Sequence, residues 1–147
     1  RQKLPLIDRT KFGAARGASN GAYVLADSPS GPPRAVILAT GSEVELALKA
    51  RDLLAAERVG VRVVSVPSLE LFAMQSAEYQ TGVLPEGVKR VAIEAAHPMP
   101  WYRWIGDSGA VLGIETFGAS APYQKLYQEY GITAERLVET VKRVIAG

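Results

Sequence analysis

Two turns rich in small residues are the first places in this sequence where chemistry is expected. They read ATGSEVE (39–45) and TFGASAP (116–122), and each joins an apolar stretch to a predicted helix. Unpaired backbone N–H groups and the positive end of the helix dipole favour an anion at such a junction. The candidates for an anion-binding or regulatory site are Gly41, Ser42, Gly118 and Ser120.

A structural role explains the same residues. Ser42 with Glu45 has the spacing of a capping box, Pro122 suits a first helical turn, and glycines permit tight bends. The spacing matches neither a Walker loop nor a dinucleotide fingerprint, and both serines lack the Gly-x-Ser-x-Gly elbow of hydrolases. The sequence therefore leaves an anion site and a simple corner open as alternatives.

Side chains suited to catalysis are scarce. His97 is the only histidine and there is no cysteine, so no base–nucleophile–orienter set can be assembled. We expect His97, which precedes Pro98, to be an exposed loop residue. Glu94 and Glu115 lie at strand ends, where they are either solvated or need backbone N–H groups or an arginine of another chain. We predict no catalytic, cofactor-binding or metal-binding residue in this chain.

An aromatic cluster follows Glu94. Trp101, Tyr102 and Trp104 surround Arg103, which is the composition of an interface hot spot. A helix that packs two tryptophans into its own core would look the same. The sequence does not separate an interface from a core here.

Composition indicates an ordinary globular protein. The 147 residues are 48% hydrophobic and 22% charged, with no cysteine, which fits a reducing, cytoplasmic compartment. No apolar run is long enough to cross a bilayer, so we expect no membrane partner. Residues 1–20 carry five basic side chains and one acidic, a charge of +4 against +2 for the whole chain. These basic groups are spread out with a single aromatic, Phe12, so we expect a linker arm and no nucleic-acid partner.

Hydrophobic periodicity predicts strands that alternate with helices. The predicted strands are 21–27, 35–40, 61–67, 88–96 and 110–115. The predicted helices are 43–60, a short one near 71–75, an aromatic one within 98–106, 121–130, and 133–146 capped by Thr133.

This order predicts a three-layer α/β fold, with a mostly parallel sheet of about five strands and helices on both faces. The first strand precedes the proline-rich turn 28–34, which is too short for a crossover, and is expected to be an antiparallel edge strand. We expect residues 1–20 to be a linker from a preceding domain and 21–147 to be one α/β domain. The chain opens without an initiator Met, as expected of part of a larger protein.

Several motifs in combination resemble the C-terminal domain of transketolase. They are ILATGSEVELALKA (37–50), VRVVSVPSLELFAMQ (61–75), WYRWIG (101–106), ETFGASAPYQKLYQEYGIT (115–133) and the opening Arg1-Gln2. The resemblance covers essentially the whole chain. One departure is EAAHPMP (94–100), where the family often reads Glu-Ala-Gly, so His97 is expected to be particular to this chain.

The resemblance implies a parent enzyme of the pentose phosphate pathway that moves a two-carbon ketol unit from a ketose phosphate to an aldose phosphate. It implies thiamine diphosphate and Mg²⁺ or Ca²⁺, held by two earlier domains across a homodimer interface. In the family, the arginine that matches Arg1 contacts the phosphate of the sugar substrate, and a guanidinium suits that contact. The present chain is then an assembly module that is inactive alone.

Two alternatives stay open. The chain resembles, less closely, the matching domain of deoxyxylulose-phosphate synthase or of the β chain of 2-oxo acid dehydrogenases. It also fits a stand-alone module that binds a regulatory anion or nucleotide at its helix N-termini.

Overall fold

A computed structural model describes residues 8, 15–95, 98–113 and 131–147. The strands are β1 (Tyr23–Ala26), β2 (Ala35–Ala39), β3 (Val61–Ser65), β4 (Lys89–Glu94) and β5 (Ala110–Gly113). The helices are α1 (Glu43–Ala56), α2 (Leu69–Ala73), α3 (Ala77–Val83), α4 (Tyr102–Ile105) and α6 (Ala134–Ala146), with 3-10 turns η1 (Ala15–Asn20) and η2 (Met99–Trp101).

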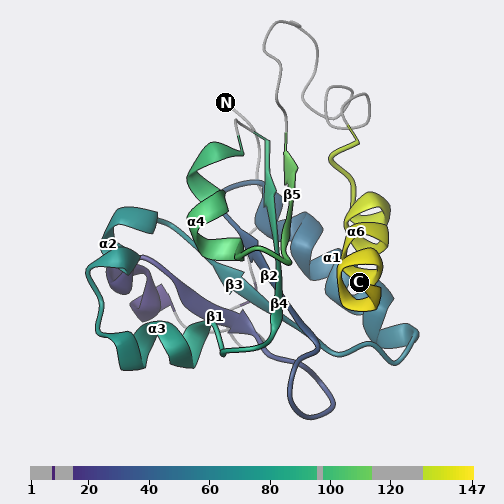
Figure 1. Ribbon diagram of the computed structural model, residues 1–147, viewed down its shortest axis with the longest axis horizontal. Coiled ribbons are helices and arrows are strands. Elements are labelled where there is room, and N and C mark those ends of the chain that lie inside the picture. Colours follow the sequence, from purple (N-terminus) through teal and green to yellow (C-terminus); the bar gives the residue numbers. More distant parts are fainter. Residues whose placement is uncertain (1–7, 9–14, 96–97, 114–130) are drawn as a thin grey trace, which may run out of the picture.

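The strands form one sheet in the order β1-β3-β2-β4-β5. β3, β2, β4 and β5 are parallel to one another, and β1 pairs antiparallel with β3 at one edge. The predicted antiparallel edge strand is therefore confirmed, and its partner is β3, not the next strand in sequence. Crossovers of β2–α1–β3 and β3–α2–α3–β4 lie on opposite faces of the sheet (Figure 1).

Helices cover both faces, as predicted. Ile37 and Ala39 of β2 pack with α1 and α6 in one apolar cluster. Val36 and Leu38 point to the other face and pack with Phe72 of α2 and the aromatic turn. Every residue of β2 is buried, which explains why its sequence is a continuous apolar run without alternation.

The region between β3 and β4 differs from the prediction. The predicted short helix near 71–75 is present as α2, two residues earlier, but the second helix of this segment, α3, was not predicted. Ser68 and Ser76 cap them, accepting hydrogen bonds from the N–H groups of Leu71 and Tyr79. Each serine is the N-cap residue directly before its helix. The second capping serine is therefore the sequence signal that a second helix begins at Ala77. The aromatic helix begins as η2 and continues as α4, and predicted helix 121–130 lies outside the described residues.

The capping box predicted for α1 is wrong. Ser42 has φ −68° and ψ −22°, and its side chain makes no capping hydrogen bond. Its Oγ instead donates to Glu43 Oε1 at 3.0 Å, while Glu45 faces Lys49 one turn on. The turn that precedes α1 is instead held by a backbone hydrogen bond, in which the N–H of Glu43 donates to the carbonyl of Thr40 at 3.2 Å. The Thr133 cap of α6 is confirmed, since its hydroxyl accepts from the N–H of Arg136.

A close backbone approach fixes α2 against the edge of the sheet. Gly21 has φ +83°, and a Cβ there would lie 2.2 Å from the backbone nitrogen of Phe72. Its carbonyl accepts a hydrogen bond from the N–H of Ser68 at 3.0 Å. The Tyr79 hydroxyl adds a bond to the carbonyl of Ala22 at 2.7 Å. Only glycine combines this dihedral with this approach, so Gly21 sets where α2 begins.

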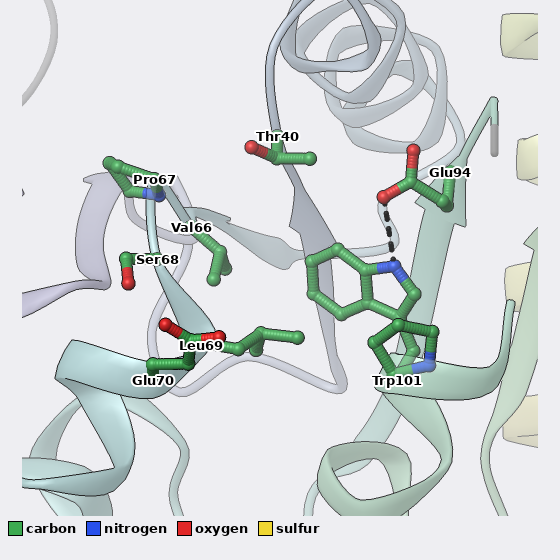
Figure 2. Close-up of a pocket in the computed structure, with 9 residues that line it drawn as sticks. Thr40, Val66, Pro67, Ser68, Leu69, Glu70, Glu94 and Trp101 are labelled. Carbon is green, nitrogen blue, oxygen red and sulfur yellow. Dashed lines mark hydrogen bonds between the residues drawn. The ribbon is translucent and has the colours of Figure 1, made fainter. Parts of the chain in front are cut away.

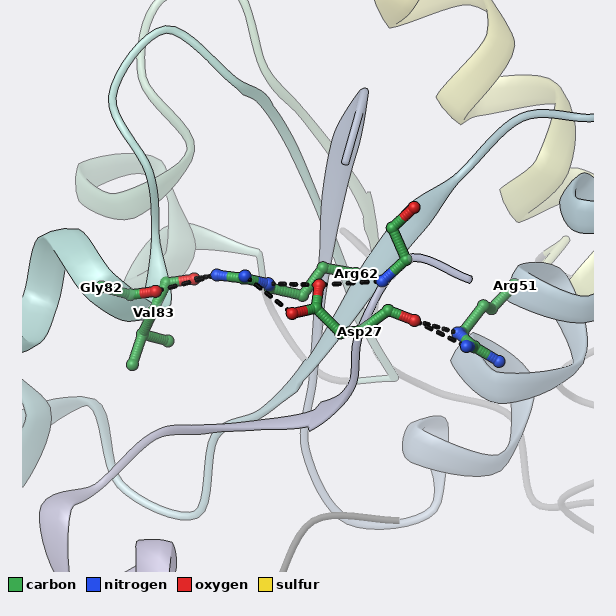
Figure 3. Close-up of polar contacts among 6 residues, drawn as sticks. Asp27, Arg51, Arg62, Gly82 and Val83 are labelled. Carbon is green, nitrogen blue, oxygen red and sulfur yellow. Dashed lines mark hydrogen bonds and ion pairs between the residues drawn. The ribbon is translucent and has the colours of Figure 1, made fainter. Parts of the chain in front are cut away.

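A polar network ties four elements together at the amino end of β3 (Figure 3). Arg62 makes a two-pronged contact with Asp27, with Nε–Oδ1 and Nη2–Oδ2 both 2.9 Å. Its Nη1 donates to the carbonyls of Gly82 and Val83 at the end of α3. Arg51 of α1 donates twice to the carbonyl of Asp27. The end of β1 is thereby joined to α1, β3 and α3.

This network predicts an acid-sensitive contribution to stability. The hydrogen bonds from Arg62 hold the pKa of Asp27 below its usual value of 3.8, against a smaller opposing effect of burial. A lowered folded-state pKa adds stability above the unfolded-state pKa, and this is lost as the pH falls through the folded-state value. Because 55% of the Asp27 side chain is exposed, we expect Asp27→Asn to cost only about 1 kcal/mol at pH 7.

Urea unfolding followed by circular dichroism measures this cost between about pH 7 and pH 2. The difference between wild type and Asp27→Asn should shrink steadily as the pH falls below about 4, because Asp27 becomes protonated in the folded state. Asp107→Asn, in the exposed turn after α4, is the matched control and should leave stability unchanged. A cost for Asp27→Asn that stays constant over this range would contradict the assignment.

Candidate functional site

The sheet has a topological switch point between β2 and β4. The chain leaves the carboxyl end of β2 toward β3 on one side, and leaves β4 toward β5 on the other. Open α/β sheets bind ligands in the crevice that this divergence creates. A cavity of about 380 Å³ lies at this place, bordered by residues that follow β2 and β3 and end β4.

The lining of the cavity combines carboxylates, hydroxyls and apolar side chains. Its polar members are Thr40, Ser68, Glu70 and Glu94, and its apolar members are Val66, Pro67, Leu69, Pro100 and Trp101. Ser68, Leu69 and Glu70 border one side, and Glu94 and Trp101 border the other (Figure 2). The two carboxylates therefore enter from opposite walls, and no basic side chain is present among these nine residues.

Glu94 is held in place by the aromatic turn. The indole Nε1–H of Trp101 donates to Glu94 Oε2 at 3.2 Å (Figure 2). Trp101 is 2% exposed and packs in the cluster beneath α2 and α4. A half-buried carboxylate needs a hydrogen-bond donor, and for Glu94 the indole of Trp101, seven residues later in the same chain, is one.

The aromatic cluster proves to be mainly core. Trp101 and Trp104 are buried, and the Trp104 ring lies 4.9 Å from that of Phe72 between centroids. The guanidinium of Arg103 lies 5.0 Å from the Trp104 ring and covers its outer side. Tyr102 is 54% exposed. The interface reading therefore applies at most to Tyr102, while the tryptophans anchor η2 and α4 to the sheet.

The predicted anion site at Gly41 and Ser42 lies close to this cavity in sequence, directly after Thr40. Gly41 adopts φ +55°. Glu43, the first residue of α1, is buried, with 4% of its surface exposed. An anion there would share the helix terminus with the Glu43 carboxylate. The anion role of Gly41 and Ser42 stays a prediction. Arg1, His97, Glu115, Gly118 and Ser120 lie outside the described residues.

The described residues do not fit a diphosphate cofactor and its metal. Among residues 8, 15–95, 98–113 and 131–147, no three histidine, aspartate or glutamate side chains are grouped to hold a metal ion. A diphosphate in the cavity would face the carboxylates of Glu70 and Glu94, and none of the nine described lining residues is basic. In the same part of the chain, no helix is long and apolar enough to span a membrane.

Sequence reasoning identified Glu94 but missed Thr40, Ser68 and Glu70. The available signal was positional, because Thr40 directly follows β2 and Ser68 follows β3 by three residues. Carboxyl ends of adjacent parallel strands meet at one edge of a sheet, so these residues are neighbours of the end of β4. The missing information was strand order, which places β2 between β3 and β4.

Layers, strand order and the crevice at the switch point define a doubly wound α/β domain. Residues 21–133 match the model of the transketolase-like C-terminal domain family. The chain belongs to this family and corresponds to the C-terminal region of transketolase.

Individual transketolases are similar to this chain in sequence and in structure. The chain is 50% identical to the transketolase of Rhodobacter capsulatus over 99% of its length, and 47% identical to the chloroplastic transketolase of Solanum tuberosum over 98%. It spans only 22% and 19% of these two relatives. Among solved structures, transketolase from Leishmania mexicana has a TM-score of 0.83 at 40% identity, covering 91% of this chain and 19% of its own. A transketolase mutant from Pichia stipitis has a TM-score of 0.88 at 31% identity, covering 99% and 20%.

The Glu94–Trp101 hydrogen bond predicts a measurable coupling between the two side chains. Trp101→Phe removes the donor but keeps most of the ring, and Glu94→Gln keeps an acceptor without the charge. We expect the single Trp101→Phe change to cost about 2 kcal/mol, because it leaves a half-buried carboxylate without this donor. In the Glu94→Gln background the same change should cost about 1 kcal/mol less.

Urea unfolding of the four proteins in this double-mutant cycle gives the coupling energy. Trp104→Phe is the matched control for loss of indole volume, since its ring packs on Phe72 in the same cluster. It should show no coupling to Glu94→Gln. A coupling near zero for Trp101 would mean that the hydrogen bond does not position Glu94.

Proposed function

We propose that this chain is the assembly domain of a transketolase and that the reactive groups belong to the rest of the parent. The parent transfers a two-carbon ketol unit between sugar phosphates, in the cytoplasm, as part of the pentose phosphate pathway. The observation that carries the proposal is the match of residues 21–133 to the transketolase-like C-terminal domain, together with 50% identity to a transketolase. Solved Pichia stipitis transketolases include complexes with sedoheptulose 7-phosphate and xylulose 5-phosphate.

Thiamine diphosphate and a divalent metal, Mg²⁺ or Ca²⁺, are assigned to the parent and not to this chain. This division follows the family resemblance, which implies that two earlier domains hold the cofactor and its metal. Bound elsewhere in the parent, the cofactor supplies the carbanion chemistry of ketol transfer. The described residues contribute a rigid doubly wound lobe, which supports the neighbouring domains and a homodimer.

Arg1 is the one residue of this chain proposed to touch substrate. It matches the phosphate-contacting arginine of the family, and a guanidinium grips a phosphate through two parallel hydrogen bonds. The relatives named above are transketolases, which favours this family over deoxyxylulose-phosphate synthase and 2-oxo acid dehydrogenase. The stand-alone module that binds an anion at its helix N-termini is less favoured, because the relatives named above are transketolases of which this chain spans about a fifth.

The proposal predicts a phosphate-specific defect when Arg1 is replaced in the parent enzyme. With xylulose 5-phosphate as ketol donor, Arg1→Ala should raise KM for an aldose phosphate acceptor by about tenfold or more, because a charge-assisted phosphate contact is lost. The KM for the same aldose without its phosphate should change little. Steady-state assays with both acceptors measure the difference.

Arg9→Ala, a second arginine of the predicted linker arm, is the matched control and should leave both KM values unchanged. The chain 1–147 alone, with thiamine diphosphate and Mg²⁺ added, should show no ketol transfer. Transfer by this chain alone would overturn the division of labour, and a parent without ketol transfer would overturn the proposed reaction. An equal loss for both acceptors would remove the phosphate role of Arg1.

A further inference from the structure

All sulfur in this chain is held in two exposed thioethers. The sequence has two methionines, Met74 and Met99, and no cysteine. Met74 is 79% exposed and Met99 is 67% exposed. A thioether is oxidised more readily when solvent reaches it, and no thiol of this chain competes for the oxidant. The two methionines are therefore the positions at which a peroxide reacts first.

The backbone around both methionines is held without their side chains. Met74 ends α2, and its N–H donates to the carbonyl of Leu71 at 3.2 Å. Met99 begins η2, in which the N–H of Trp101 donates to the carbonyl of Pro98 at 3.0 Å. A sulfoxide oxygen on either exposed side chain stays in water, so oxidation buries no polar atom that lacks a partner.

The core offers a peroxide no comparable target. The apolar clusters on the two faces of the sheet consist of aliphatic and aromatic side chains, without sulfur. The two tryptophans, Trp101 and Trp104, are 2% and 8% exposed. Oxidation of a buried methionine puts a polar group into a core and disrupts it, whereas oxidation of the two exposed methionines leaves both clusters unchanged.

We propose that Met74 and Met99 are sites of reversible oxidation by hydroperoxides, and that the protein keeps its fold when both are oxidised. With hydrogen peroxide, the sulfur attacks one oxygen, the O–O bond breaks and an S–O bond forms. Sulfur gives up two electrons, and the second oxygen leaves as water. A dithiol-dependent sulfoxide reductase reverses the step, because the dithiol becomes a disulfide and the sulfoxide oxygen leaves as water. This modification does not rest on the proposed ketol transfer.

The rate of oxidation in the folded chain, compared with the rate in the urea-unfolded chain, tests whether both sulfur atoms are accessible. The chain 1–147 is treated with hydrogen peroxide at neutral pH, and peptide mass spectrometry follows the gain of one oxygen at each methionine. The two rates should agree within about threefold at both positions, because folding already leaves both residues exposed. Met74→Leu and Met99→Leu should each remove one of the two oxygens gained.

Leu54→Met is the matched control for burial. Leu54 of α1 is 0% exposed, and the change nearly conserves volume. The introduced thioether should be oxidised at least about tenfold more slowly in the folded chain than in the unfolded chain, because it reacts only through opening of the structure.

The oxidised wild-type chain tests tolerance and reversibility. Its urea midpoint should lie within about 0.3 M of that of the untreated chain. Two sulfoxide reductases, one for each sulfoxide epimer, should together restore the original mass in the presence of dithiothreitol.

Four results would overturn the proposal. Oxidation of Met74 that is more than about threefold slower in the folded chain would mean that its sulfur is shielded. Equal rates for Met74 and for the thioether introduced by Leu54→Met would mean that exposure does not select the site. A larger fall of the urea midpoint would show that the fold does not tolerate the sulfoxides. Sulfoxides that resist both reductases would remove the reversibility.

Discussion

Burial of the central strand on both faces is the constraint on which the rest of this structure depends. All five residues of β2 are buried, and β3 and β4 hydrogen-bond to its two edges. A strand of this kind is stable only with an apolar layer on each side. α1 and α6 supply one layer, and α2 and the η2–α4 turn supply most of the other. The described part of the chain therefore satisfies the demands of β2 from its own helices.

The same constraint determines where chemistry can occur. Parallel strands covered on both faces leave only their ends for polar groups, and the switch point concentrates them at the carboxyl ends of β2 and β4. Thr40 and Glu94 lie there because their strands end there. The opposite end carries the Asp27–Arg62 network, which joins the edge strand to the helices. One end of the sheet thus carries the Asp27–Arg62 ion pair, and the other carries the cavity lined by Glu70 and Glu94.

Much of the fold was predictable from local signals. The apolar run 35–39, the β-branched stretch 61–65 and the amphipathic helix after Thr133 identify their elements without ambiguity. One error arose at Ser42, which has a capping sequence but adopts helical φ and ψ, and its hydroxyl donates to Glu43 instead of capping the helix. That Glu70 and Glu94 line the same cavity could not be predicted, because it depends on the order of the strands in the sheet, which no local sequence pattern encodes. Likewise, the sequence alone could not decide whether Trp101 and Trp104 lie in the core or at an interface. Their burial in one cluster with Phe72 places them in the core.

Native-state hydrogen exchange on the chain 1–147 tests most directly whether the central strand is covered from within. The account predicts that the amides of β2 exchange only through global unfolding, with a free energy equal to that from urea unfolding. Amides of the edge strand β1 should exchange through smaller openings. Exchange of β2 at the rate of β1, well below the global free energy, would contradict the account, because it would mean that one face of the sheet needs polypeptide beyond this chain for its cover.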